Sequence, residues 1–284
     1  MPAFSAPVRT EPNTSGWHGR LEIELAQRGA RTALVRRRHK GPYLVQSPFY
    51  PEGPVCHIYL LHPPGGVVGG DTLNLAVTAG PDSAALLTSP AAMKLYRSAG
   101  PIAAVTQIIS VAPQASVEWL PQETLAFSGA RAHLRTRVEL STHSRFIGWE
   151  ALCLGRPANG EDFSAGRVRQ DLEVWLDGHP LLIERNDIRA GESLAQKSFG
   201  LRGLSTLATL VVYPSEEHLE RTAWQVAQAN EGVQAAVSSI DGLLTCRIIA
   251  GNMRATKALL NNWWRSLRPL VLSREPCAPR IWAT

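Results

Sequence analysis

The sequence predicts a mainly β protein whose C-terminal part carries a small α/β layer with two helices. Three observations lead to this fold class. Apolar and polar side chains alternate through most of residues 17–200, turn signals with Gly and Pro separate these segments, and helical spacing appears only after residue 214. The alternation alone leaves a sandwich, a barrel and a solenoid open, and no fixed-period repeat favours a β-helix of identical coils.

Composition divides the chain into three parts. Residues 1–16 are a polar, flexible leader without the apolar core of a signal peptide. Residues 17–200 form the β-rich body, and residues 201–284 form a β-α-β-β-α segment that packs on the body as one structural unit. Because no apolar run approaches the ~18 residues of a membrane span, we expect a cytoplasmic protein that does not enter a membrane.

The strands of the body are predicted from alternation and from their turns. Residues 21–25 and 31–35 alternate on either side of a turn and indicate a hairpin, and Asp177-Gly178 is a strong hairpin signal. Residues 146–154 are apolar on both faces, as a central strand would be. The other strands predicted here are residues 56–61, 72–77, 133–140, 167–177 and 181–183.

Two helices are predicted in the C-terminal part. Ser215 and Asn252 are the expected N-caps, because their side chains can accept a hydrogen bond from the first turn. Trp282 lies near the C-terminus and needs burial, and we expect it to dock on the protein's own body. The predicted helix faces are Leu219, Ala223 and Val226, then Met253, Thr256, Leu260, Trp263 and Leu267. The accompanying strands are residues 207–213, 233–239 and 243–250.

Charge and cysteine content exclude several classes of protein. The net charge is +5, nearly all of the positive charge comes from arginine, and only residues 36–40 form a basic run, so nucleic-acid binding is not expected. The four cysteines, Cys56, Cys153, Cys246 and Cys277, contain no C-x-x-C pair. This spacing argues against a zinc ribbon or a disulfide scaffold.

The most unusual stretch is residues 62–71, with two prolines and four glycines. A dinucleotide-binding loop requires G-x-G-x-x-G before a helix, but here a strand follows. A nucleotide-triphosphatase loop requires Lys where Asp71 stands. We therefore expect a fixed bend and no tightly bound cofactor. No hydrolase, zinc-protease or kinase signature occurs elsewhere, so no catalytic residue is expected and the residues favour a scaffold over an enzyme.

Two groups of residues are candidates for handling ions. His62 and Cys56 are the nearest candidates for metal ligation, although Cys56 and His57 point to opposite faces of one strand, and a buried thiol beside a hydrogen-bonded imidazole is the simpler interpretation. Glu150 and Glu118 lie within apolar strands, where a carboxylate must be paired or raised in pKa. They indicate either structural pairs with arginine or the polar lining of an internal route for water or ions.

Several motifs occur in order from about residue 20 to the C-terminus. They match an H-P-P-G-G-(I/V)-x-G-G-D signature, an L-L-T-x-P-x-A-x-K-x-Y-R-S segment and a W-L-P-Q-x-T segment, followed by residues 148–150, 153–156, 264–268 and 279–282. The residues of the first two motifs are His62, Pro63, Pro64, Gly65, Gly66, Gly69, Gly70 and Asp71, then Thr88, Lys94, Tyr96, Arg97 and Ser98. This set resembles the UreD family of urease accessory proteins, also called UreH. Ala92 and Met93 depart from it, since the family often has Gly or Thr there.

The resemblance implies a non-catalytic maturation factor. Members of this family bind apo-urease and recruit UreF and the GTPase UreG, and the assembly inserts nickel into the urease metallocentre. Nickel would then be handled in transit. The implied fold is mainly β, wound in a β-helix-like arrangement with two helices. In this setting Glu150 and Glu118 would line an internal polar passage between the UreF–UreG side and urease.

The alternative from another class is a β-solenoid carbohydrate-active enzyme, or another scaffold protein. Such an enzyme requires paired carboxylates at a cleft and usually an export signal, and the sequence shows no leader of that kind. A nucleic-acid adaptor would require salt-dependent binding.

Overall fold

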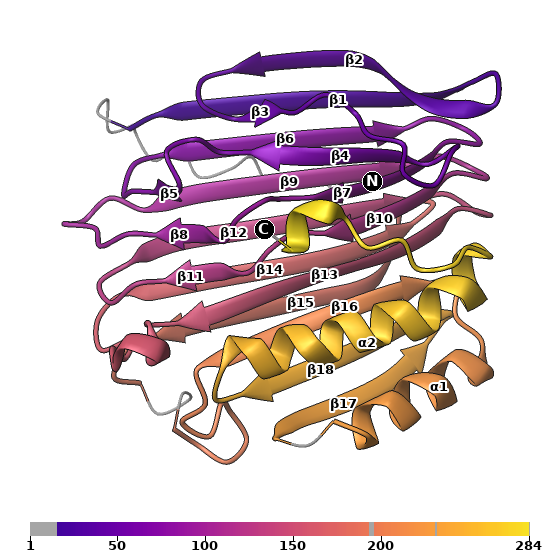
Figure 1. Ribbon diagram of the computed structural model, residues 1–284. Helices are drawn as coiled ribbons and strands as arrows, with labels where there is room; N and C mark the ends of the chain where they lie inside the picture. The colour runs from indigo at the N-terminus through magenta and orange to yellow at the C-terminus, as the bar shows by residue number, and fades with distance from the viewer. Residues whose placement is uncertain (1–15, 193–195, 231, 284) are drawn as a thin grey trace.

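The strands of this computed structural model wind into a β-solenoid of about four turns, with two helices near the C-terminus (Figure 1). The structure describes residues 16–283 except residues 193–195 and 231. The predicted mainly β class is therefore confirmed, and its wound form is the one that the family resemblance implies. The predicted leader lies outside the described residues except for Gly16.

The first wall of the solenoid is a seven-stranded sheet. In spatial order its strands are β15 (His179–Arg189), β14 (Arg167–Leu176), β12 (Arg131–Leu140), β9 (Ala103–Val111), β6 (Thr72–Ala79), β1 (His18–Arg28) and β2 (Arg31–Lys40). The strands from β1 to β14 pair in parallel, and antiparallel hairpins at β1–β2 and β14–β15 form the two edges. Both hairpins were predicted from the sequence.

The second wall faces the first. Its strands are β17 (Val233–Ile240), β18 (Leu243–Ala250), β16 (Thr206–Tyr213), β13 (Arg145–Leu154), β10 (Ser116–Leu120), β7 (Ala84–Thr88), β4 (Cys56–Leu61) and β3 (Leu44–Val45). Parallel pairing runs from β4 to β13. Three short strands, β5 (Gly66–Val67), β8 (Met93–Leu95) and β11 (Thr124–Ala126), pair beside this path.

The coils stack without a sequence repeat because they differ in length. The register of the first wall aligns Leu75 with Gln107, Gln107 with Thr136 and Thr136 with Leu172, at unequal sequence intervals. Each coil nevertheless contributes inward-facing apolar residues to one core between the walls, because alternation directs every second side chain inward. The same alternation made the individual strands predictable.

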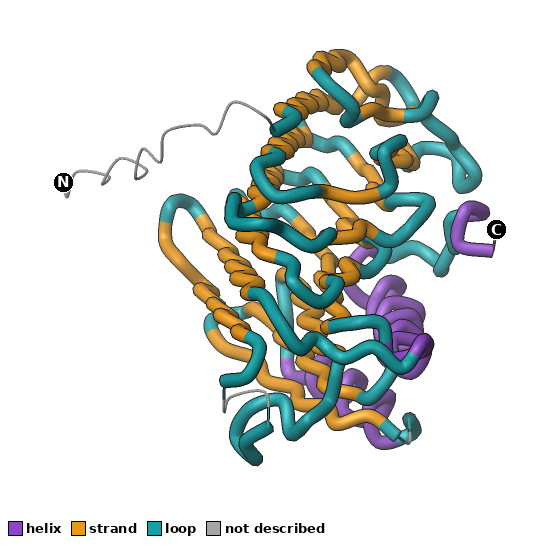
Figure 2. Tube along the Cα trace, turned by 90° about the vertical axis from the view of Figure 1, so that its left-hand side faces the viewer, coloured by secondary structure: helices purple, strands orange, loops and turns teal. Residues whose placement is uncertain are grey.

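The helices α1 (Glu217–Gln228) and α2 (Met253–Leu272) cover the outer side of the second wall (Figure 1), and both lie on one side of the strand stack (Figure 2). Asn252 caps α2 as predicted, since its side chain accepts from the Ala255 N–H at 2.9 Å. The predicted Ser215 cap is wrong, because the N-cap of α1 is Glu216. The Ser215 N–H donates instead to the Gly242 carbonyl at 2.7 Å, which ties Ser215 to the β17–β18 turn.

The C-terminal tail returns to the second wall and ends in a short helical turn, η3 (Arg280–Ala283). A similar short turn, η1 (Pro157–Asn159), lies between β13 and β14 in the body. Trp282 in η3 packs against the rings of Trp149 and Trp264, with centroids 5.8 and 5.5 Å away. Docking of Trp282 on the protein's own body is therefore confirmed. Among the described helices, none has the length and hydropathy needed to cross a bilayer.

Candidate functional site

The stretch 62–71 forms a bend fixed by Asp71. The Asp71 carboxylate accepts from the Val68 N–H at 2.9 Å and from the Trp17 N–H at 2.8 Å, and its own N–H donates to the Val68 carbonyl at 3.0 Å. Gly65 donates to the His62 carbonyl at 2.8 Å and has a φ of 73°, a value that favours glycine. The residue types of this motif thus determine a local backbone shape.

The first two sequence motifs interlock. A Cβ at Gly66 would lie 2.2 Å from the Tyr96 ring, and one at Gly69 would lie 2.1 Å from the Ser98 hydroxyl oxygen. The Tyr96 N–H also donates to the Val67 carbonyl at 2.9 Å. Glycine is therefore required at both positions for the second motif to approach this closely.

The remaining residues of the second motif extend this packing. Lys94 is the register partner of Gly66 between β8 and β5, and the Arg97 side chain lies against Gly129. The Thr88 hydroxyl donates to the Leu120 carbonyl at 2.6 Å and accepts from the Trp282 indole N–H at 2.9 Å. These residues join neighbouring coils and the tail.

The motifs converge on a chamber of about 120 Å³ between the two walls, which is partly open because Ala91 on its lining is exposed. Its lining is largely apolar, and the indole N–H of Trp119 is buried there without a hydrogen-bond partner among the described residues. The lining residues that come from the sequence motifs are His62, Gly65, Ser89, Pro90, Ala91, Ala92, Met93, Trp119, Pro121, Gln122, Thr124 and Glu150. The chamber is therefore the strongest candidate for a functional site.

Glu150 is the only carboxylate among the described residues that line this chamber. It projects inward from β13, accepts from the Gln170 amide at 3.0 Å and contacts the Thr136 hydroxyl. Burial raises the pKa of Glu150 to about 7, and the nearby carboxylates of Glu184 and Asp171 act in the same direction. The expectation of a raised pKa agrees with this geometry, whereas no arginine pairs with Glu150 among the described residues.

The hydroxyl of Thr136 joins Glu150 to Gln107. It lies within hydrogen-bond distance of the Glu150 carboxyl group and of the Gln107 side-chain oxygen, the latter at 2.8 Å. Because a hydroxyl carries one proton, both contacts in this orientation of the Gln107 amide are hydrogen bonds when Glu150 is protonated and donates to Thr136. With the amide turned so that its nitrogen donates to Thr136, the hydroxyl donates to an ionised Glu150.

A run of polar groups extends from Glu150 toward strands β15, β16 and β18 at the C-terminal end of the solenoid. Thr209 is the register partner of Glu150, and its hydroxyl donates to the Glu184 carboxylate at 2.7 Å. Glu184 also accepts from Arg247 at 2.6 Å, and the Arg247 side chain is 43% exposed. Sequence reasoning missed Thr136, Gln170 and Glu184, although the first two are polar residues at apolar positions of alternating strands.

Glu118 lies on the other face of the same wall. It is 1% exposed and accepts from the indole of Trp264 at 2.7 Å and from Arg268 of α2 at 2.9 Å. Arg268, 0% exposed, also donates to Glu52 at 2.7 and 2.8 Å. Glu118 thus forms the predicted structural pair with an arginine, Arg268. The prediction that Glu118 lines a passage together with Glu150 is wrong because the two side chains face opposite sides of the sheet.

The candidate metal ligands are not brought together. Cys56 packs in the core, where burial raises the pKa of its thiol, and the His57 ring lies 2.6 Å from Glu52. His62 lines the chamber, and burial lowers the pKa of its imidazole although Asp71 acts in the opposite direction. Across residues 16–192, 196–230 and 232–283, no three His, Cys, Asp or Glu side chains form a metal-binding group.

Fold and site together define a class of protein: a β-solenoid flanked by two helices, with the carboxyl group of Glu150 in a largely apolar chamber between the two walls. Residues 18–283 match the model of the family described as UreD urease accessory protein. Three relatives called urease accessory protein UreD are similar along nearly the whole chain. The relative from Alkalilimnicola ehrlichii is 43% identical over 274 residues, covering 96% of this chain and 94% of its own.

The relative from Klebsiella aerogenes is 42% identical over 275 residues, covering 96% of this chain and 99% of its own. The relative from Pseudomonas fluorescens is 44% identical over 284 residues, covering 99% and 100%. The chain therefore belongs to the UreD family of urease accessory proteins, as the order of its motifs predicted.

Proposed function

We propose that this protein is a urease maturation factor that binds apo-urease, recruits UreF and the GTPase UreG, and acts as an adaptor during nickel insertion. Family membership along the whole chain supports this role, since the relatives are called urease accessory proteins. The absence of a phosphate-binding signature in the sequence is consistent with GTP chemistry in a partner.

We further propose that the chamber is part of an internal polar passage through which nickel moves as cargo. The observation that carries this proposal is the run of polar side chains from Gln107 and Thr136 through Glu150 to Glu184. A pKa of about 7 lets Glu150 exist as a carboxylate that contacts a cation or as a neutral acid that releases it. The described residues offer few fixed ligands for nickel, which favours transit of the ion over its storage. A chamber of about 120 Å³ also has room for several waters around it.

The carbohydrate-active alternative is less well supported by the site. Glycosidases of the common type place two carboxyl groups on either side of the scissile bond, one as acid and one as base or nucleophile. Among the described lining residues of the chamber there is one carboxyl group, that of Glu150.

The adaptor role is tested by a pull-down with apo-urease, UreF and UreG, followed by measurement of nickel in the urease. We expect the full chain to retain all three and to raise the nickel content. If the wild-type chain retains none of them, the maturation role is wrong.

The passage is tested separately with Glu150→Leu, which removes the carboxyl group while keeping a side chain of similar size. We expect unchanged complex assembly and reduced nickel in urease, because the polar run is interrupted. Glu24→Leu, on the outer face of the first wall, is the matched control. Full urease activation by Glu150→Leu would show that the passage does not run past this residue.

A further inference from the structure

The outer face of the first wall carries a grid of guanidinium groups. Side chains that alternate with the buried ones point outward from β12, β14 and β15, and the register places Arg131, Arg167 and Arg189 side by side in one row across the strands. We call this grid the arginine face; its members are Arg131, Arg135, Arg137, Arg167, Arg169, Arg185 and Arg189.

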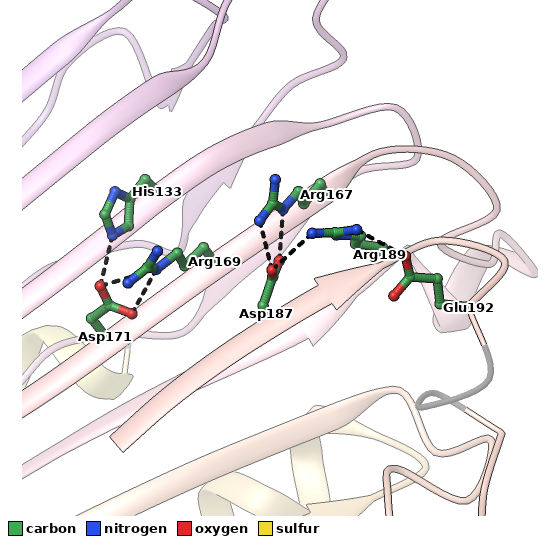
Figure 3. Close-up of polar contacts among 7 residues, drawn as sticks. All are labelled: His133, Arg167, Arg169, Asp171, Asp187, Arg189 and Glu192. Atoms are coloured by element: carbon green, nitrogen blue, oxygen red, sulfur yellow. Dashed lines mark hydrogen bonds and ion pairs between the residues drawn. The ribbon is translucent and has the colours of Figure 1, made fainter. Parts of the chain in front are cut away.

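Two carboxylates on this face, those of Asp171 and Glu173, lie beneath the guanidinium groups. The side chains of Asp171 and Glu173 are 5% and 6% exposed, whereas those of Arg135 and Arg169 are 41% exposed. Asp171 is covered because Arg169 donates to it at 3.0 Å and the His133 ring lies 2.8 Å away (Figure 3). At these two positions solvent therefore meets the positive groups, whereas Asp187 and Glu139 are exposed.

A second contact set orients two arginines of this row, Arg167 and Arg189. Arg167 donates to both oxygens of Asp187 at 2.7 and 2.6 Å, and this interaction lowers the pKa of Asp187. Arg189 contacts Asp187 at 3.3 Å and Glu192 at 3.2 Å (Figure 3). Within the described chain, the exposed Arg131 and Arg185 make no ion pair.

The row formed by Arg131, Arg167 and Arg189 is costly for the isolated sheet. Like charges directly opposite one another on neighbouring strands destabilise a sheet, whereas the next rows of this face alternate the two signs. The grid also reaches β15, whose second edge has no strand beside it among the described residues. Arginine is enriched at protein interfaces because its planar group forms paired hydrogen bonds with carboxylates.

We propose that the arginine face docks a carboxylate-rich surface of another protein in the urease maturation assembly. This inference rests on the proposed adaptor role. A protein partner fits better than nucleic acid or a membrane, because Asp187 and Glu139 stand among the arginines and would repel a continuous row of phosphates. Partner carboxylates can instead approach Arg131 and Arg185, which are exposed and form no ion pair within the described chain, although Asp171 is the register partner of Arg185.

The test is the double variant Arg131→Glu/Arg185→Glu in the full chain, with affinities measured for purified apo-urease, UreF and UreG at low and moderate salt. Both side chains are exposed, so we expect the fold to persist, as checked by circular dichroism. For one partner, we expect binding to weaken at least tenfold and the wild-type affinity to fall as salt rises. Arg28→Glu/Arg38→Glu, at the opposite edge of the same sheet, is the matched control and should change little.

The outcomes separate this inference from the adaptor role. Suppose that the wild-type chain binds a partner and that the affinities of both double variants for it lie within about twofold of the wild-type affinity. The arginine face is then not a docking surface, while the adaptor role stands. If the wild-type chain binds none of the three, both proposals fail. If the reversal affects only binding to duplex DNA or to anionic vesicles, the assignment of a protein partner is overturned.

Discussion

Two glutamates with similar sequence surroundings have opposite roles. Glu118 and Glu150 both lie in apolar strands of the second wall, but Glu118 faces α2 and meets Arg268, whereas Glu150 faces the chamber. The sequence indicates that both are buried. It does not indicate which side each faces relative to a helix more than a hundred residues later, because that depends on how the walls and helices pack.

Glu150→Gln should change how stability depends on pH. With a pKa of about 7 against 4.5 for an ordinary glutamate, the folded wild type holds one more proton than the unfolded chain between these values. Its free energy of unfolding therefore falls as pH rises from about 4.5 to about 7. The Gln variant has no such carboxyl group and does not lose this stability. The free energy of unfolding of the variant minus that of wild type should therefore rise by up to about 3 kcal/mol from pH 5 to pH 8, as measured by urea unfolding.

The matched control for this measurement is Glu139→Gln on the outer face, where the side chain is 43% exposed. An equal pH dependence for wild type and Glu150→Gln would contradict a protonated carboxyl group in the chamber.

Arg268→Met should be among the most destabilising single substitutions. It leaves Glu118 and Glu52 beside one another without their shared cation, and breaking a buried pair costs roughly 3–5 kcal/mol. Arg221→Ala breaks the exposed pair with Glu217 on α1 and should cost below about 1 kcal/mol. Urea unfolding at neutral pH measures both, and equal costs would mean that the buried cluster does not anchor α2.

At the scale of elements, local chemistry decided which predictions were confirmed. Strands with a period of two and hairpins at strong turn signals were predicted because neighbouring residues determine them. The stacking of coils was not predicted from the residues, since unequal coil lengths leave no repeat to detect. The prediction of Ser215 as N-cap was wrong because the N-cap of α1 lies one residue later, at Glu216. The backbone N–H of Ser215 instead donates to the Gly242 carbonyl.

The two predicted caps provide a matched pair for measurement. Asn252→Ala removes the acceptor of the Ala255 N–H and should lower the free energy of unfolding by about 1 kcal/mol. Ser215→Ala removes a side chain that caps no helix and should change it by less than about 0.5 kcal/mol. A larger loss at Ser215 than at Asn252 would contradict the described helix starts.

At the scale of the whole molecule, the second wall joins two hydrophobic cores. Leu87 and Phe146 face the core between the walls, while their neighbours Leu86 and Ile147 face the core beneath the helices. Because alternate residues of the same strands serve both cores, loss of either core exposes a face of the other. The C-terminal segment and the body are therefore expected to unfold together.

Leu86→Ala and Leu87→Ala test this coupling with one substitution in each core. Each should cost about 2–5 kcal/mol and lower the Tm, yet tryptophan fluorescence and far-UV circular dichroism should still report one coincident transition. Val68→Ala, where the side chain is 47% exposed, is the control and should have little effect. Two separate transitions in either leucine variant would show that the parts unfold independently.

Part of the candidate site was accessible from sequence. The stretch 62–71 and Glu150 were identified because proline, glycine and a carboxylate stand out against their neighbours. Their partners in the chamber come from other coils, and only the fold brings them together. Glu184, which the proposed passage includes, lies on the edge strand β15, where a glutamate is not distinctive in a sequence.

The parallel pairing of the walls has a consequence for biosynthesis. Neighbouring strands such as β9 and β12 are separated by a complete coil, so every pairing must wait until a further coil has left the ribosome. Folds dominated by such distant pairings form slowly and expose unpaired edges meanwhile. Arg268 and Trp282 are synthesised near the end, so Glu118 and the outer face of the second wall stay uncovered during most of translation. Because these surfaces stay uncovered while the chain is made, lower growth temperature should raise its soluble yield.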